Sequence, residues 1–301
     1  MYSNHNTNSA RKQADENFLA KRIGDRLNSA KITDGEWAQI APDKVIVATE
    51  NRSWLYQPRS QDDRFCQPME RAGSIATTGK LLDGAIAAAR YAVNSDVRPP
   101  ALTAIRWVWR LAGDYHLCFP TVRLMKKAAQ CFATSKRWNL AEWASQRAKE
   151  EMGHDLLALR DINSLGYNAE AVVKALIPSA TLSLTDYFIR SVKDDDPIDC
   201  VGYSYTMERM GLGVDEKYIQ KVEMLLPKNT HATRCRRVHS SVGVDTEHTE
   251  ETVEMIAKLT AFERIRVARA CYETAILCFS PPSKDYISDE ELQKILAPLK
   301  L

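Results

Sequence analysis

Two short carboxylate-histidine pairs constrain how this chain can fold. The first pair is Glu151 and His154, the second is Asp245 and His248, and in each the histidine follows the acid by three residues. On an α-helix, side chains three positions apart share a face, so each pair would present one carboxylate and one imidazole to a common point. Helical bundles that hold two iron ions combine two such pairs with a lone carboxylate from each of two other helices. The pattern therefore predicts a helical bundle with a metal centre inside it.

Composition and charge narrow the class of partner. The chain has 301 residues, of which 45% are hydrophobic, and this is enough to bury a large core. Its 41 basic and 39 acidic residues give a net charge of +2, which provides no strong field for nucleic acid or for an anionic membrane. We therefore expect a small-molecule substrate, with neither a nucleic-acid nor a membrane partner, and a homodimer is left open.

Cysteine usage and the start of the chain bear on the cellular compartment. The seven cysteines are an odd number with no CxxC spacing, which disfavours a disulfide framework and a zinc ribbon. No apolar run reaches the roughly 18 residues of a membrane span, and the first residues show no basic head followed by an apolar stretch. These features predict a cytoplasmic protein.

The helical pattern divides the chain into three parts. Residues 1–99 are predicted to be an N-terminal extension, partly disordered, with a short strand at 44–48 and one helix at about 69–93. Residues 100–281 are predicted to form the helical domain, and residues 282–301 a helical appendage that Ser288 caps. Within the domain we expect helices at 101–117 (bent or broken near Pro120), 122–134, 139–166, 182–192, 199–210, 215–226 and about 244–279.

Two further acids are candidates for the lone carboxylates. Asp114 shares a helical line with apolar residues of the first predicted helix, and Glu208 shares one with Val201 and Tyr205. A solvated glutamate is the alternative for Glu208. His116 is better interpreted as a hydrogen-bonded structural histidine.

The two pairs also have ordinary interpretations. Glu151 and His154 could form a surface ion pair, and Asp245 could be the N-cap of the last helix. An ordinary interpretation is weakest for His248. This residue lies on the apolar face of the last predicted helix, in line with Met255, Ile256, Leu259, Phe262 and Ile265.

Four segments together resemble a known family, the haem-oxygenase-like di-iron oxidases and oxygenases. The resemblance covers roughly residues 100–280 in the right order. The segments are Glu150-Glu151-Met152-Gly153-His154-Asp155 through Leu165-Gly166, Gly113-Asp114-Tyr115-His116 through Phe119-Pro120, Tyr205-Thr206-Met207-Glu208, and Val242-Gly243-Val244-Asp245-Thr246-Glu247-His248. The resemblance implies an all-α, haem-oxygenase-like bundle and a metal site formed by Asp114, Glu151, His154, Glu208, Asp245 and His248.

Two departures from the family pattern concern the second metal ion. Asp114 is shorter than the glutamate that is usual there, and Ser241 stands where many members carry a further histidine ligand. We do not expect His239 to replace it, because nine residues before His248 on a helix is about half a turn away in angle.

The function implied is a non-haem iron enzyme. It would hold one or two Fe²⁺ ions, use O₂ as co-substrate, and oxidise a small organic molecule in the pocket of the bundle, with Glu151, His154, Glu208, Asp245 and His248 as catalytic residues. The alternatives are a metal-free enzyme similar to thiaminase II, with Cys118 or Cys200 as nucleophile, a non-catalytic helical interaction protein, and a ferritin-like bundle. No nucleotide-binding or serine-hydrolase motif is present.

Overall fold

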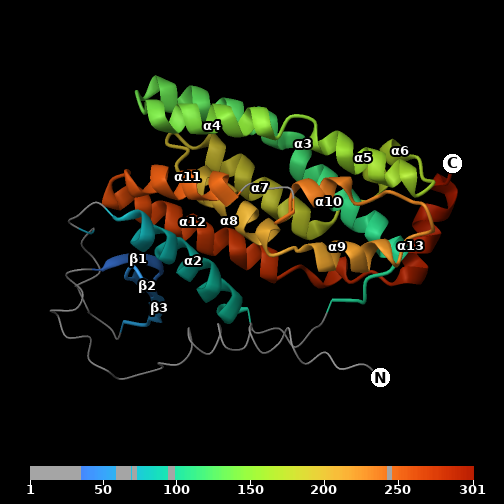
Figure 1. Cartoon of the computed structure of the whole chain (residues 1–301), viewed down its shortest axis with the longest axis horizontal. Coiled ribbons are helices and arrows are strands. Elements are labelled where there is room, and N and C mark those ends of the chain that lie inside the picture. The colour runs from blue at the N-terminus through green and yellow to red at the C-terminus, as the bar shows by residue number, and fades with distance from the viewer. Residues whose placement is uncertain (1–34, 59–68, 70–72, 94–98, 243–245) are drawn as a thin grey trace.

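The fold is a bundle of helices with one small sheet on its flank (Figure 1). The computed structural model describes residues 35–58, 69, 73–93, 99–242 and 246–301, so the predicted disorder of the first 30 residues lies outside the described part. The helices are α2 (Ile75–Ala92), α3 (Ala104–Thr134), α4 (Trp138–Glu150), α5 (His154–Ser164), α6 (Ala169–Ala175), α7 (Ser179–Lys193), α8 (Asp199–Leu212), α9 (Glu216–Glu223), α10 (Arg234–Val238), α11 (Thr246–Ala257), α12 (Ala261–Phe279) and α13 (Asp289–Leu296). Short 3₁₀ turns follow at Ser283–Asp285 and Ala297–Leu299. The predicted helical bundle is thus confirmed.

The sheet covers one side of α2 and α12. Strands β1 (Glu36–Ala41), β2 (Lys44–Ala48) and β3 (Ser53–Tyr56) are antiparallel in the order β1-β2-β3. The predicted strand at 44–48 is confirmed as β2, and its two neighbours were not predicted. Alternate residues of β1 are buried, including Ala38 and Ile40, which belong to the same hydrophobic core as the helices. The described strands β1 and β2 and helix α2, which precede residue 100, therefore pack into the bundle.

The long helix α3 joins two hydrophobic cores. Its first half contributes Trp107 and Leu111 to one core with α6, α9 and α13, and its second half contributes Met125 and Phe132 to the other, with α2, α8 and α12. The stretch between them, near Cys118, meets neither core fully. This middle stretch is where the cavity described below lies.

Pro120 does not break α3: of the two sequence-based expectations, a bend or a break, the break is wrong. Proline at this position lacks the N–H that would bond to the carbonyl of His116 one turn earlier. The Thr185 hydroxyl of α7 donates to that carbonyl, at 3.4 Å. A neighbouring helix thus compensates for the missing bond, and one helix runs through from Ala104 to Thr134.

Two predicted long helices are each broken once, and these predictions were wrong. The helix expected at 139–166 divides at Gly153, which has φ +87°, into α4 and α5. The helix expected at 244–279 divides before Thr260, which caps α12 and forms a capping box with Glu263. Because α12 begins anew there, Phe262 is 61% exposed rather than part of the core line.

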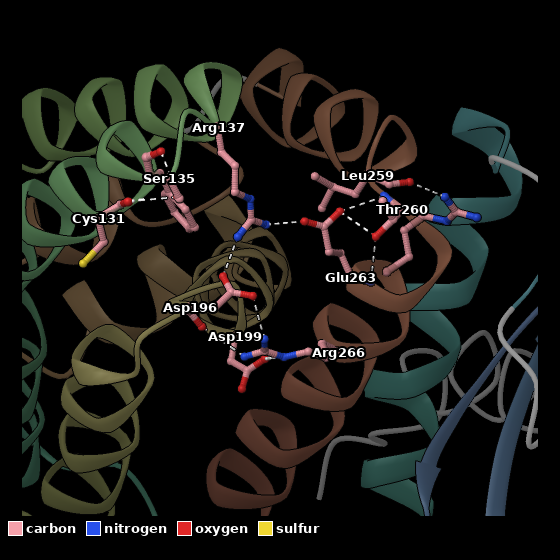
Figure 2. Close-up of polar contacts among 11 residues, drawn as sticks. Cys131, Ser135, Arg137, Asp196, Asp199, Leu259, Thr260, Glu263 and Arg266 are labelled. Carbon is pink, nitrogen blue, oxygen red and sulfur yellow. Dashed lines mark hydrogen bonds and ion pairs between the residues drawn. The ribbon is translucent and has the colours of Figure 1, made fainter.

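An ion-pair network fixes the end of the bundle where α12 begins (Figure 2). Arg137, at the turn between α3 and α4, donates to Asp196 in the α7–α8 connection and to Glu263 in α12. Arg266 of α12 donates to Asp196 at 2.7 Å and to Asp199 at 3.0 Å. Two guanidinium groups thus tie three segments that are distant in sequence.

Within the described residues, no single helix is long and apolar enough to cross a membrane. Only α6 and α7 taken together, among the described helices, are long and apolar enough for a membrane span, and the chain bends by 84° between them.

Candidate metal centre

A cavity of about 540 Å³ lies between α3, α8 and the junctions α4–α5 and α10–α11. Four of the six predicted site residues line it, namely Asp114, Glu151, His154 and Glu208. The cavity also has an apolar wall, formed by Leu117, Met125, Phe188, Met207 and Val238. Its volume is that of a site for a small organic molecule.

One carboxylate and two imidazoles converge on this cavity. The donor atoms of Glu151, His154 and His239 all lie within 4.8 Å of one another. His154 Nδ1 is 3.2 Å from Glu151 Oε2, and the rings of His154 and His239 meet edge to face with centroids 4.7 Å apart. With metal–ligand distances of about 2.0 to 2.2 Å, two donors on one ion stand roughly 2.9 to 3.5 Å apart. The spacing of Glu151 and His154 thus fits ligands of a common ion.

The break between α4 and α5 places the first pair. Glu151 is the C-cap of α4, His154 is the first residue of α5, and Gly153 supplies the left-handed turn between them. The predicted pairing of Glu151 with His154 is therefore present, but it spans a helix junction rather than one continuous helix.

The charge states of these groups suit metal binding. Burial opposes ionisation of Glu151, yet the hydrogen bond with His154 and the charges of His239, His154 and Arg147 outweigh it, so the pKa of Glu151 lies below its usual value. Burial lowers the pKa of His239, which keeps its imidazole neutral. A charged carboxylate and a neutral imidazole are the forms that bind metal ions.

Glu208 stands in an unusually acidic part of the cavity wall. Burial raises its pKa to about 7; Arg147 opposes that shift, and Glu151 and Glu150 add to it. Arg147 lies between two of the acids, 2.9 Å from Glu150 and 3.3 Å from Glu208. Among the described residues, Oε2 of Glu208 is buried without a hydrogen-bond partner. Three acidic residues thus share the guanidinium of Arg147, and a bound cation would favour the ionised form of Glu208.

Asp114 is engaged by an arginine on the opposite side of the cavity. Arg236 donates to its Oδ1 at 2.5 Å, and the other oxygen, Oδ2, is buried with no hydrogen-bond partner among the described residues. The charge of Asp114 raises the pKa of Arg236, against the effect of burial, so the guanidinium stays charged. One oxygen of Asp114 thus remains available to a ligand in the cavity.

Two cysteines lie at the same end of the cavity as His239. Cys118 Sγ is 3.5 Å from His239 Nε2, and the donor atoms of Cys118, Cys235 and His239 lie within 4.8 Å of one another. A hydrogen bond with Cys235, together with burial, raises the pKa of Cys118 well above its usual value. Asp161 of α5 accepts the backbone N–H of Cys235 at 2.9 Å and thereby fixes the start of α10.

His239 was not expected to replace the ligand at position 241, because of its angle to His248 on a helix. The structure contradicts this premise, since α10 ends at Val238 and α11 begins at Thr246. The angle between His239 and His248 on a helix therefore does not apply. Ser241 lies in the connection, is exposed, and donates to the carbonyl of Val214 at 2.8 Å.

The remaining candidates have different outcomes. His116 contacts the carbonyl of Val173 at 2.8 Å, which confirms it as a structural histidine. Asp245 lies outside the described residues. For His248 only the backbone position is described, in α11, one turn before Thr252; Thr252 contacts Arg147 of the cavity wall at 3.5 Å.

Comparisons with known proteins found one similar structure and no matching family. Neither a family model nor a curated protein matches the chain. One crystal structure from Shewanella denitrificans OS217, described as a domain of unknown function with a heme oxygenase-like fold, is similar at 20% identity and a TM-score of 0.47. The match covers 73% of this chain and 88% of that one. A likeness of this size supports no conclusion about the fold or the chemistry of this chain.

Proposed function

We propose that this protein is a non-haem iron oxidase or oxygenase that acts on a small organic molecule inside the cavity. The observation that carries the proposal is the convergence of Glu151, His154 and His239. Two histidines and one carboxylate that leave open coordination positions are typical of ferrous enzymes that use O₂. A ferrous ion bound there would supply one-electron and O₂ chemistry. The proposal concerns one ion, whose three donors are all described; a second ion through Asp245 and His248 stays a prediction.

The cavity wall would position the substrate. The apolar side chains around Phe188 and Met207 would hold a hydrocarbon part and keep water away from it. The Asp114–Arg236 pair faces the same space with one unpaired carboxylate oxygen, which would accept a hydrogen bond from a polar group of the substrate. Glu208, with its pKa near 7, can hold or release a proton at neutral pH.

The test is anaerobic titration of the metal-free protein with ferrous iron. Each of the variants Glu151→Gln, His154→Gln and His239→Gln should bind ferrous iron at least roughly tenfold more weakly. Loss of even a residue that only supports a metal ligand lowers metal affinity by about 10- to 100-fold. His231→Gln is the matched control, since His231 is exposed and outside the cavity. Unchanged iron affinity in all three variants would refute the site. If the rate of O₂ uptake by the iron-loaded protein were the same with and without each small organic molecule tested, the reaction class would be refuted.

One specific contact favours a second candidate function. The Cys118–His239 contact resembles a nucleophile beside a base, as a metal-free transferase or hydrolase would need. The raised pKa of Cys118 weakens this alternative, because the thiolate is the reactive form. Rapid alkylation of Cys118 by iodoacetamide at neutral pH, in protein without metal, would favour it over the iron enzyme.

A further inference from the structure

A second set of metal donors shares His239 with the first. Cys118 comes from the middle of α3, whereas Cys235 and His239 stand four residues apart, at the start and just past the end of α10. All three side chains line the cavity. The first set, Glu151 and His154 with His239, offers oxygen and nitrogen, and the second offers two sulfurs and a nitrogen.

The geometry of the second set fits a tetrahedral ion. With zinc–sulfur bonds of about 2.3 Å and zinc–nitrogen bonds of about 2.0 to 2.1 Å, a sulfur and a nitrogen on one tetrahedral ion stand about 3.5 to 3.6 Å apart. Cys118 Sγ and His239 Nε2 are 3.5 Å apart. The two sulfurs of such an ion stand about 3.8 Å apart, and those of Cys118 and Cys235 lie within the 4.8 Å that encloses the set.

The surroundings hold the three donors in place. Asp161, which is completely buried, accepts the N–H of Cys235 and also pairs with Arg234, so the first turn of α10 is anchored to α5. Cys118 lies on the buried side of α3, next to Ala158. Three protein donors leave a fourth position, as in zinc sites that keep a water or substrate ligand.

We propose that Cys118, Cys235 and His239 form a binding site for a thiol-seeking cation such as Zn²⁺, distinct from the iron site but sharing one imidazole with it. Soft thiolate ligands select zinc over ferrous iron, whereas the carboxylate and imidazoles of the first set suit iron. Binding converts both thiols to thiolates and releases their two protons to solvent, with no change of oxidation state.

The shared imidazole makes the two sites compete. A neutral imidazole has one nitrogen lone pair for a metal, so an ion on the thiol site removes His239 from the iron site. Zinc would then lower the affinity for ferrous iron and act as an inhibitor. This competition rests on the proposed iron site, whereas the thiol site itself does not.

Cadmium titration of the reduced, metal-free protein tests the thiol site directly. Cd²⁺ bound to thiolate gives a charge-transfer absorption in the ultraviolet, which reports sulfur ligation without any enzyme assay. We expect one equivalent to produce the band, and Cys118→Ser and Cys235→Ser each to weaken cadmium binding at least roughly tenfold. Cys131→Ser is the control, because Cys131 is a free cysteine that does not line the cavity.

Variants of the two sets separate this inference from the proposed function. His154→Gln should lose iron and keep the cadmium band, Cys118→Ser should do the reverse, and His239→Gln should weaken both. Far-ultraviolet circular dichroism checks that each variant is folded. If a serine variant does not fold, the cadmium titration is made with Cys235→Ala instead.

The possible failures are distinct. A folded, reduced wild-type protein that gives no thiolate band, or a band that survives replacement of both Cys118 and Cys235, would overturn the thiol site alone. A normal band without iron binding would overturn the proposed function alone. Simultaneous tight binding of zinc and ferrous iron to one chain would overturn the competition.

Discussion

Replacing Glu208 by glutamine should make the metal-free protein more stable above pH 7 and should change its stability little near pH 4.5. The pKa of Glu208 is raised from 4.5 to about 7, chiefly by burial, with Glu151 and Glu150 adding to the effect. Between these pH values the folded protein keeps a proton that the unfolded chain has released. The free energy of unfolding therefore falls as the pH rises through this window, and the loss is complete above about pH 7.

The size of the effect follows from the shift. A difference of about 2.5 pKa units corresponds to about 3 kcal/mol. Glutamine has nearly the same shape and no charge, so it avoids this cost, but it also removes a charged partner 3.3 Å from Arg147. The net gain expected at about pH 8 is thus about 1 to 3 kcal/mol.

Urea denaturation in the presence of a chelator, at about pH 5 and about pH 8, measures the difference. Glu251→Gln is the control, because Glu251 is an exposed residue of α11 and should give the same change at both pH values. If Glu208→Gln changed the free energy of unfolding by the same amount at both pH values, then Glu208 would not be a buried acid of raised pKa.

Three structural predictions concern the packing of α12 and the turns that position it. Gly202→Ala should destabilise the protein by about 1 to 3 kcal/mol, because the added Cβ would lie 2.4 Å from the carbonyl oxygen of Val267; a melting temperature equal to that of the wild type would contradict this. Arg137→Met should cost about 1 to 3 kcal/mol by removing the cation that joins two connections, and the loss in thermal stability should shrink at high salt. Thr260→Ala should lower the free energy of unfolding by about 1 kcal/mol, because it removes the hydroxyl that accepts the backbone N–H of Glu263 at the start of α12. Urea denaturation measures this loss, and an unchanged free energy of unfolding would mean that the cap does not stabilise α12.

Much of the fold was predictable because helix signals are local. The helical periodicity after residue 100 predicted α3, α4, α7, α8 and α9, and Ser288 was predicted as the cap of α13, which it is. Local sequence signals also marked the two helix breaks, at Gly153 and before Thr260. Gly153 stands inside the expected long helix, and Thr260 followed by Glu263 is a capping-box pattern. Both signals were outweighed by an apolar periodicity that continued past them.

The sheet was only partly predictable, since β1 and β3 gain their stability from partners elsewhere in the chain. Ser53–Tyr56 is a four-residue strand with no alternation of buried and exposed residues. In β1 the buried positions include the charged residue Glu36, which Thr77 and Arg264 of distant helices satisfy. No local pattern identifies such a residue as buried, because its partners are known only after the helices have packed.

The candidate site shows the same division between local and tertiary information. Glu151 and His154 were found because they are three residues apart, and a contact at that spacing survives even the break at Gly153. His239 was missed because its contacts with His154 and Cys118 cross from α10 to α5 and α3, so no spacing along the chain records them. The polar turn around Ser241, ahead of Gly243, was the one local signal that residues 239–248 are not a single helix. With the two helices separated, His239 belongs to the cavity wall, and the candidate ligand set gains a second imidazole that does not depend on α11.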